Sequence, residues 1–149
     1  MNFWPPFFFA GIKVARISDD WREADVELRQ GRLNMNYVGT HFGGSLFAMT
    51  DPFYMIMLSN ILGRDHVVWD KSASIEFLRP GRGTVKAQLR ITDEMLDEVR
   101  ANTMNDGDRF TPVWPVEIRD AGGELVARVH KTMYIRRGRD DRKRVGSKG

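Results

Sequence analysis

The most constraining feature of this sequence is a long apolar run from Phe42 to Leu62 that holds a single carboxylate, Asp51, followed directly by Pro52. A run of about 20 apolar residues is long enough to cross the hydrocarbon core of a bilayer. An ionised Asp near the centre of a membrane helix costs roughly 2.5 to 3.5 kcal/mol on insertion scales, which argues against a span. A helix that is apolar all round is otherwise buried in a protein core. We therefore predict no membrane span and one long central helix enclosed by the rest of the chain.

Alternating apolar and polar residues predict that much of the remaining chain forms antiparallel strands. The clearest case is the segment from Trp21 to Arg29, in which Ala24, Val26 and Leu28 alternate with charged residues. A period of two with one polar face is typical of antiparallel sheets. Comparable segments predict five further strands, at residues 11–17, 67–78, 84–92, 110–119 and 124–136.

A short helix is expected between the fourth and fifth of these six strands. Thr92 or Asp93 is a suitable cap for a helix that runs to Asn105, and Pro112 and Pro115 predict that the fifth strand is bulged or lies at an edge near its start. A long helix can be apolar all round only if a sheet curls about it. The sequence thus predicts an α+β fold, a curved antiparallel sheet of about six strands wrapped around one long central helix.

The basic residues are concentrated at the C-terminal end. Residues 136–149 hold seven Lys or Arg and two Asp, a net charge of +5, so the remaining chain carries −2 of the total charge of +3. No nucleic-acid partner is expected, because the basicity does not belong to the folded part. We predict one domain over residues 1–135, within the usual size range for a single domain, followed by a basic, disordered tail over residues 136–149.

The residue types exclude several kinds of chemistry. The chain has no Cys, so it has no disulfide framework, thiol nucleophile or thiolate metal site. Its three histidines lack metal-ligand spacing, and its glycines form neither a P-loop nor a dinucleotide-binding turn. We therefore expect no metal and no cofactor. A chain without Cys is compatible with a reducing compartment, and we predict a cytoplasmic location.

The start of the apolar run carries a distinctive motif. The segment 36–44, Asn-Tyr-Val-Gly-Thr-His-Phe-Gly-Gly, is followed by Asp51 eight residues after Gly43. This pattern resembles the active-site signature of hotdog-fold acyl-CoA thioesterases of the phenylacetate-pathway type, in which Asn, a Gly-containing turn, His-Gly-Gly and an acidic residue follow in this order. A hotdog subfamily known only as a domain of unknown function has similar sequence features. They are the Phe-Gly-Gly variant of the motif, the Asp51-Pro52 pair and the segment 116–120.

The resemblance implies that residues 1–135 form a hotdog domain with acyl-CoA thioesterase activity, in which Asp51, Gly43 and Asn36 are the catalytic residues. Backbone N–H groups at a helix N-terminus are suitable donors for the oxyanion formed from a thioester, and a glycine lets the ligand approach them closely. Asp51 would act as the base or the nucleophile. Asn36 would hold the water or the thioester carbonyl.

The chain departs from the resembled signature at one position. Phe42 stands where those thioesterases have His, and the nearest His, His41, lies one position earlier. The resemblance therefore carries over no catalytic His, and we expect His41, Phe42 and Gly44 to bind the substrate. Because a His is available nearby, a hotdog dehydratase is a further alternative, although its pairing with an acidic residue needs a different spacing.

The Asp51-Pro52 pair also allows a purely structural role. An Asp followed by Pro is a common helix start, with Asp as the N-cap and Pro at the first helical position. The long helix would then consist of two segments, and the protein would be a non-catalytic acyl-binding or scaffold hotdog protein in which Asp51 is only a helix cap. Close helix packing is the corresponding alternative for Gly43 and Gly44.

The spacing of the site residues predicts an oligomer. On one continuous helix Gly43 and Asp51 lie about 12 Å apart along the axis, too far for both to act on one thioester carbon that must sit about 3 Å from each. We therefore predict a homo-oligomer, a dimer or a dimer of dimers, in which Gly43 of one subunit faces Asp51 of the other. The expected ligand is acyl-CoA or another acyl thioester.

Overall fold

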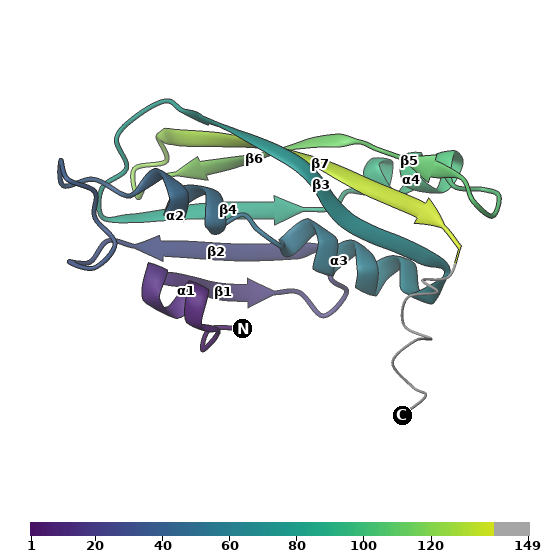
Figure 1. Ribbon diagram of the computed structural model, residues 1–149, viewed down its shortest axis with the longest axis horizontal. Coiled ribbons are helices and arrows are strands. Elements are labelled where there is room, and N and C mark those ends of the chain that lie inside the picture. The colour runs from purple at the N-terminus through teal and green to yellow at the C-terminus, as the bar shows by residue number, and fades with distance from the viewer. Residues whose placement is uncertain (139–149) are drawn as a thin grey trace.

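The computed structural model describes residues 1–138, and their strands form one curved antiparallel sheet (Figure 1). The strand order is β1-β2-β4-β6-β7-β3, and the short β5 pairs with β7. The strands are β1 (Ile12–Ile17), β2 (Glu23–Arg29), β3 (His66–Phe77), β4 (Thr84–Arg90), β5 (Arg109–Phe110), β6 (Val113–Arg119) and β7 (Leu125–Arg137). The helices are α1 (Pro5–Ala10), α2 (Gly43–Ala48), α3 (Phe53–Leu62), the 3₁₀ turn η1 (Gly63–Asp65) and α4 (Asp93–Asn102).

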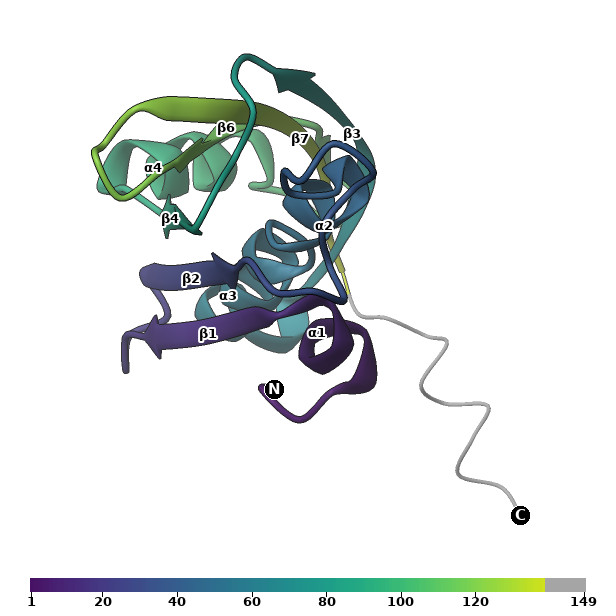
Figure 2. The same cartoon turned by 90° about the vertical axis from the view of Figure 1, so that its left-hand side faces the viewer.

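The hydrophobic core lies between α3 and the concave face of the sheet. In β2 the alternate residues Ala24, Val26 and Leu28 are fully buried, and β4 and β7 show the same period of two. Figure 2 shows the sheet curling around α2 and α3, and side chains of α3 such as Phe53 and Met57 fill the interior. The predicted α+β fold, with an antiparallel sheet wrapped around a central helical segment, is confirmed.

The prediction of one continuous helix is wrong, because the helical segment is broken into two. α2 ends at Ala48, and residues 49–52 form turns before α3 begins at Phe53. Pro52 has no N–H to donate, and its ring disfavours helical backbone in the residue before it. Asp51 therefore lies in a connection between two helices rather than on the face of one.

The sheet formed by residues 1–138 has seven strands rather than about six, because the predicted strand at 110–119 is divided. Thr111 and Pro112 separate β5 from β6, and both of these strands pair with β7. A proline cannot donate a hydrogen bond to a neighbouring strand, which accounts for the interruption. The helix predicted after β4 is confirmed with Thr92 as its N-cap, but it ends at Asn102.

The edge strand β3 contains a bulge that changes which residues face the core. The register shifts at Lys71, the residue left out of the pairing with β7. Before the bulge Asp70 pairs with Met133, and after it Ala73 pairs with Lys131. Because paired residues share a face of the sheet, even-numbered residues of β3 face inward before the bulge and odd-numbered residues after it.

The N-terminal segment forms a helix that the sequence analysis did not predict. α1 has proline in its first turn, where a missing N–H is tolerated, and it ends at Gly11, whose φ of 77° is left-handed. Phe7 is buried, and its ring centroid lies 5.9 Å from that of Phe53 in α3. α1 thus covers part of the core, while Phe8 and Phe9 stay exposed.

Residues 43–65 are long and apolar enough, by length and composition alone, to cross a membrane. The core helix of a globular protein passes the same test, and half-buried or buried side chains of this segment pack under the sheet. At the other end of the chain, β7 continues to Arg137, beyond the predicted domain limit at residue 135. The remainder of the predicted tail, residues 139–149, lies outside the described residues.

Candidate functional site

Several predicted site residues line one pocket at the end of the sheet where α2 begins. The pocket has a volume of about 520 Å³ and lies between the loop preceding α2 and the link from β3 to β4. The first segment contributes Asn36, His41 and Gly43, and the second contributes Phe77 and residues 78–82. Three of the residues that the motif singles out are therefore brought together.

The side chain of Asn36 holds the loop that forms one wall of this pocket. Its Nδ2 donates to Thr40 Oγ1 at 2.7 Å and to the His41 carbonyl at 3.2 Å. Its Oδ1 accepts from the backbone N–H groups of Val38 and Thr40, at 3.1 and 3.0 Å. An amide side chain has two donor hydrogens and two acceptor lone pairs, and these bonds use them all. Asn36 thus shapes the loop and has no free group for the predicted contact with a thioester or water.

His41 is buried and faces the link from β3 to β4. Its backbone N–H donates to the Gly81 carbonyl at 2.9 Å, and its ring Nε2 lies 2.8 Å from the Gly83 carbonyl. A carbonyl oxygen only accepts, so Nε2 carries the proton in this contact. Within residues 1–138 no hydrogen bond or ion pair joins His41 to Asp51, so the pairing that a dehydratase would use is not formed.

The two glycines of the motif begin α2 beneath aromatic rings. A Cβ atom on Gly43 would lie 2.9 Å from the ring of Phe77, and one on Gly44 would overlap the ring of Phe42. Gly43 is the first residue of α2, after Phe42 at the N-cap position, and the N–H groups of a first helical turn have no acceptor within the helix. The geometry is compatible with both roles predicted for the glycines, close packing and access to N–H donors.

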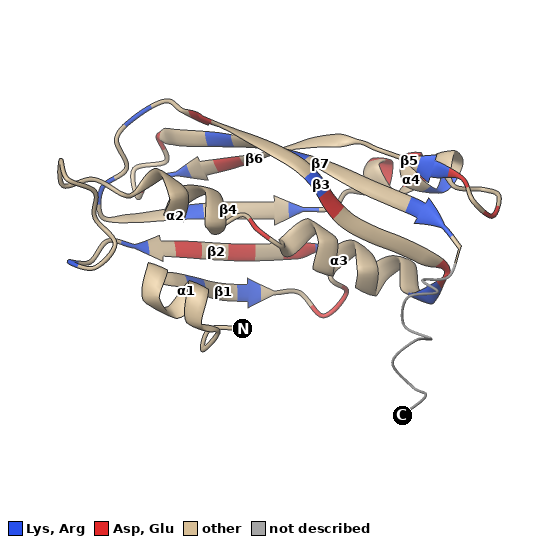
Figure 3. Cartoon of the chain, viewed as in Figure 1, with Lys and Arg blue, Asp and Glu red and all other residues tan. Residues whose placement is uncertain are grey.

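Asp51 lies outside the pocket, in the connection between α2 and α3. Figure 3 shows this connection in the red of acidic residues. The predicted alternative that Asp51 caps α3 is wrong, because Pro52 occupies the N-cap position and no side-chain cap hydrogen bond is formed. Instead, Lys131 Nζ donates to Asp51 Oδ1 at 3.1 Å. The Asp51 side chain is 49% exposed, so solvent still reaches the carboxylate.

Lys131 is a buried cation that the sequence analysis missed. Its side chain is 2% exposed, and Nζ lies 3.1 Å from a carboxylate oxygen of Asp51 and 3.1 Å from one of Asp70. The sequence does carry a signal, since Lys131 lies midway between Val129 and Met133 on the inward-facing side of β7. A lysine is almost never fully buried unless it is paired. We call Asp51, Asp70 and Lys131 the carboxylate-lysine cluster.

The two carboxylates of the carboxylate-lysine cluster have different environments. The side chain of Asp70 is 20% exposed. Burial raises the pKa of Asp70 above its usual value, the nearby Asp51 carboxylate adds to the rise, and the Lys131 ammonium opposes it. Asp51 is therefore the member that solvent reaches, and Asp70 is the deeper one.

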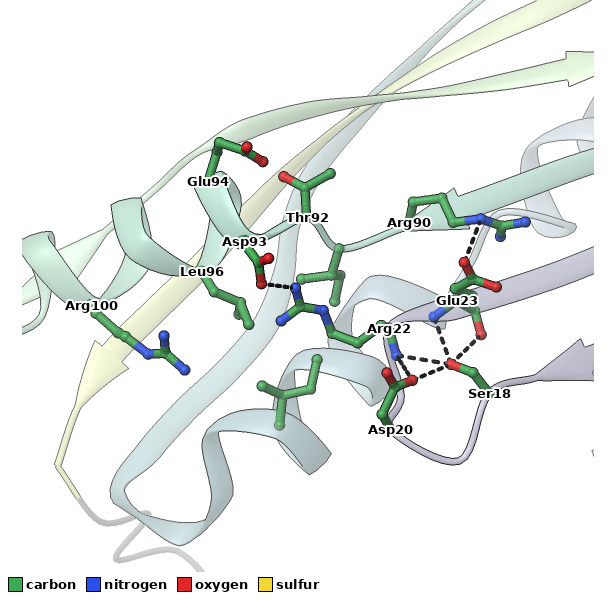
Figure 4. A pocket seen from close by; sticks show the side chains of 12 residues that line it. Ser18, Asp20, Arg22, Glu23, Arg90, Thr92, Asp93, Glu94, Leu96 and Arg100 are labelled. Carbon is green, nitrogen blue, oxygen red and sulfur yellow. Dashed lines mark hydrogen bonds and ion pairs between the residues drawn. The ribbon is translucent and has the colours of Figure 1, made fainter.

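A larger pocket, of about 1030 Å³, lies where β4 leads into α4 (Figure 4). Its charged side chains are engaged with one another, since Arg22 pairs with Asp93 and Arg90 with Glu23. None of the predicted site residues lines it, so size alone does not identify the candidate site. Within residues 1–138 no group of three or more His, Cys, Asp or Glu residues is arranged to hold a metal ion.

The sequence matches a known family over almost its whole length. The family model, described as a domain of unknown function (DUF4442), matches residues 1–135. No curated protein matches the chain.

Solved structures share the fold at low sequence identity. A protein of unknown function from Pseudomonas aeruginosa, described as a probable thioesterase, has a TM-score of 0.69 and 17% identity, covering 86% of this chain and 84% of that one. A thioesterase from Haemophilus influenzae has a TM-score of 0.66 and 18% identity, covering 91% and 85%. The PaaI protein from the phenylacetic acid degradation operon of E. coli has a TM-score of 0.62 and 18% identity, covering 93% and 88%. Such likeness shows the fold, and the predicted hotdog fold is confirmed.

Proposed function

We propose that this chain, which belongs to the DUF4442 family and has the hotdog fold, hydrolyses acyl thioesters such as acyl-CoA. A fold alone does not fix an activity, so the proposal depends on the site. The observation that carries it is the half-exposed carboxylate of Asp51, held by the buried ammonium of Lys131. A carboxylate that is oriented by an ion pair and open to solvent is suited to take a proton from water or to attack a carbonyl carbon.

The reaction also needs donors for the oxyanion. In one route Asp51 takes a proton from water as the water attacks the thioester carbon, and in the other the Asp51 carboxylate itself attacks that carbon. In both routes negative charge develops on the carbonyl oxygen, and the carbon–sulfur bond then breaks to release the thiolate. The first route leaves the free acid, and the proton held by Asp51 passes to the thiolate; in the second, water hydrolyses the acyl–Asp51 anhydride to the free acid. The proposed donors are the N–H groups of Gly43 and Gly44 at the start of α2, beside the pocket. Asn36 contributes indirectly, because it holds the loop that leads into these residues.

The complete site in this proposal forms between two copies of the chain. Gly43 lines the pocket of about 520 Å³ and Asp51 does not, so a single chain does not place both groups in one pocket. A two-fold dimer can bring Gly43 of one subunit to Asp51 of its partner, and does so twice. β3 ends the strand order of the described residues, and such an edge is a surface on which a second copy can pair. A dimer or a dimer of dimers, and a cytoplasmic location, stay predictions.

A non-catalytic acyl-binding protein is the second candidate. Phe42 occupies the position at which the resembled thioesterases have His, and the amide of Asn36 is fully used within its own loop. Both features remove groups that a catalytic site would use. In that function the pocket would bind an acyl thioester, and the carboxylate-lysine cluster would serve only the fold.

A thiol-release assay with short, medium, long and aromatic acyl-CoAs separates the two candidates. We predict that Asp51→Asn lowers turnover about 100-fold or more, the scale of lost acid–base catalysis. The variant should still be folded and unfold in a cooperative transition. Asp19→Asn, at an exposed turn position, is the matched control and should keep wild-type turnover. Equal turnover in Asp51→Asn and the wild type would rule out the catalytic role, and wild-type binding of acyl-CoA without thiol release would favour the second candidate.

A further inference from the structure

Lys131 is placed where it can act on Asp51 but not on a substrate. Its side chain is 2% exposed, and its ammonium lies between the two carboxylates of the carboxylate-lysine cluster. The bulge at Lys71 gives Asp70 the same inward direction as Lys131, although the two residues lie on different strands. Asp51 approaches from the connection between α2 and α3, so the ammonium joins the sheet to the break in the helical segment.

The charges of the carboxylate-lysine cluster depend on its cation. Two carboxylates that share a site repel each other, and a cation that contacts both offsets the repulsion that would otherwise favour their protonated forms. A protonated carboxyl group is neither a base nor a nucleophile. The Lys131 ammonium therefore favours the charged form of the two carboxylates that it contacts, and its hydrogen bond fixes the direction of Asp51.

We propose that Lys131 is a positioning residue that holds and orients the carboxylate of Asp51 through their ion pair, and that Asp70 is the second anchor of the Lys131 ammonium. This inference rests on the proposed function, because it concerns how the reacting carboxylate is held. Nζ contacts Oδ1 of Asp51, so the ammonium leaves the other carboxylate oxygen to the reacting water or thioester carbon. Neither Lys131 nor Asp70 was expected at the site from the sequence.

The test compares three variants with the wild type in the thiol-release assay, from about pH 5 to pH 9. Lys131→Met replaces the lysine by an unbranched apolar side chain, which suits a buried position. Lys131→Met combined with Asp70→Asn also removes the deeper carboxylate, so no like-charged pair is left in the interior. Lys13→Met is the matched control, because Lys13 is an exposed lysine on β1, at the other end of the strand order from β3.

We expect Lys131→Met to lower kcat at pH 7 by about 10- to 100-fold, because the reacting carboxylate of Asp51 is then misplaced. KM should change little, because Lys131 does not touch the substrate. The acidic limb of its pH–rate profile should move to higher pH, and the double variant should move it back. Lys13→Met should behave as the wild type. A lower unfolding midpoint with an unmoved acidic limb would show a merely structural role and overturn the proposal.

A measurement that needs no activity separates this proposal from the proposed function. If the wild type releases no thiol from any acyl-CoA, the proposed function fails, whereas the carboxylate-lysine cluster can still be tested by ¹³C NMR of the Asp carboxyl carbons. The Asp51 signal is assigned by its loss in Asp51→Asn. An upward move of its titration midpoint in Lys131→Met, absent in Lys13→Met, supports the role of Lys131, and an unmoved midpoint refutes it.

Discussion

His66, the first residue of β3, has an environment that disfavours its protonated form. Its Nε2 lies 3.1 Å from Thr103 Oγ1, and that hydroxyl donates to the Val99 carbonyl at 2.7 Å. The hydroxyl oxygen thus accepts from the ring, which joins the start of β3 to the end of α4. Burial lowers the pKa of His66 below its usual value, and the positive charge of Arg137 lowers it further.

This environment predicts a loss of stability on acidification. The unfolded chain binds the His66 proton at its ordinary pKa of about 6.5, whereas the folded chain binds it only at lower pH. Between these values the unfolded state holds more protons, so the free energy of unfolding falls as the pH falls through that window.

His66→Gln tests this prediction, because glutamine can still donate to Thr103 Oγ1 and does not titrate. Urea unfolding should show that the wild type loses more stability between pH 7 and pH 5 than His66→Gln does. Other titrating groups are common to both proteins and cancel in the comparison. Equal losses in the two proteins would contradict the assigned environment.

Single residues also show which parts of the site the sequence predicts and which it does not. Asn36, His41 and Gly43 were predicted together because they share a short motif, and the loop before α2 does bring them into one pocket. Lys131 was missed, because its contact with Asp51 joins residues 80 positions apart. Alternation along β7 places this lysine inward, but the strand pattern alone does not reveal which carboxylates meet it.

At the scale of elements, the junction of α1 and β1 depends on one glycine. Gly11 ends α1 with a φ of 77°, and a Cβ atom there would lie 2.8 Å from the Arg29 carbonyl oxygen and would overlap Asn34 Nδ2. That amide cannot move freely, because Nδ2 donates to the carbonyls of Ala10 and Arg29, at 2.7 and 2.6 Å.

We predict that Gly11→Ala destabilises the protein more than an alanine at another left-handed glycine does. Gly123 is the matched control, since its φ is 83° and no atom of the described residues lies within 4 Å of an added Cβ. Gly123→Ala bears only the left-handed backbone, roughly 1 to 2 kcal/mol, whereas Gly11→Ala adds a steric cost of about 1 to 3 kcal/mol. Urea unfolding measures both, and equal losses would show that the crowding at Gly11 is relieved without cost.

The strands were predictable because alternation is a local property of the chain, and Ala24, Val26 and Leu28 of β2 are buried as their spacing indicates. The bulge at Lys71 was not, because a bulge is defined against a partner strand and β7 lies far away in the sequence. The helix break at Pro52 was foreseen only as an alternative. A proline indicates an interruption, but tertiary packing decides where each helical segment ends.

At the scale of the whole molecule, the break between α2 and α3 changes the basis of the predicted composite site. The separation of Gly43 and Asp51 was inferred from one continuous helix, and this helix does not exist. A different observation now supports the same proposal, since Gly43 lines the pocket and Asp51 lies outside it, bound to Lys131. A second copy of the chain remains the simplest source of the missing carboxylate.

Mixing two inactive variants tests this arrangement. Gly43→Pro should remove one oxyanion donor without breaking α2, because the first helical residue tolerates proline and Phe42 before it is already extended, with φ −63° and ψ 129°. The ring of Phe77, which a Cβ atom at position 43 would approach to 2.9 Å, is exposed and has room to turn away. Asp51→Asn removes the carboxylate and leaves Gly43 intact. In a composite dimer, each mixed pair then regains one complete site and should show about half of the wild-type turnover.

Mass spectrometry of the mixture establishes that mixed dimers form, and each variant alone provides the inactive baseline. Mixed dimers that form and stay inactive, while both variants remain folded, would defeat the composite site, because the carboxylate and the donors would then have to come from the same chain.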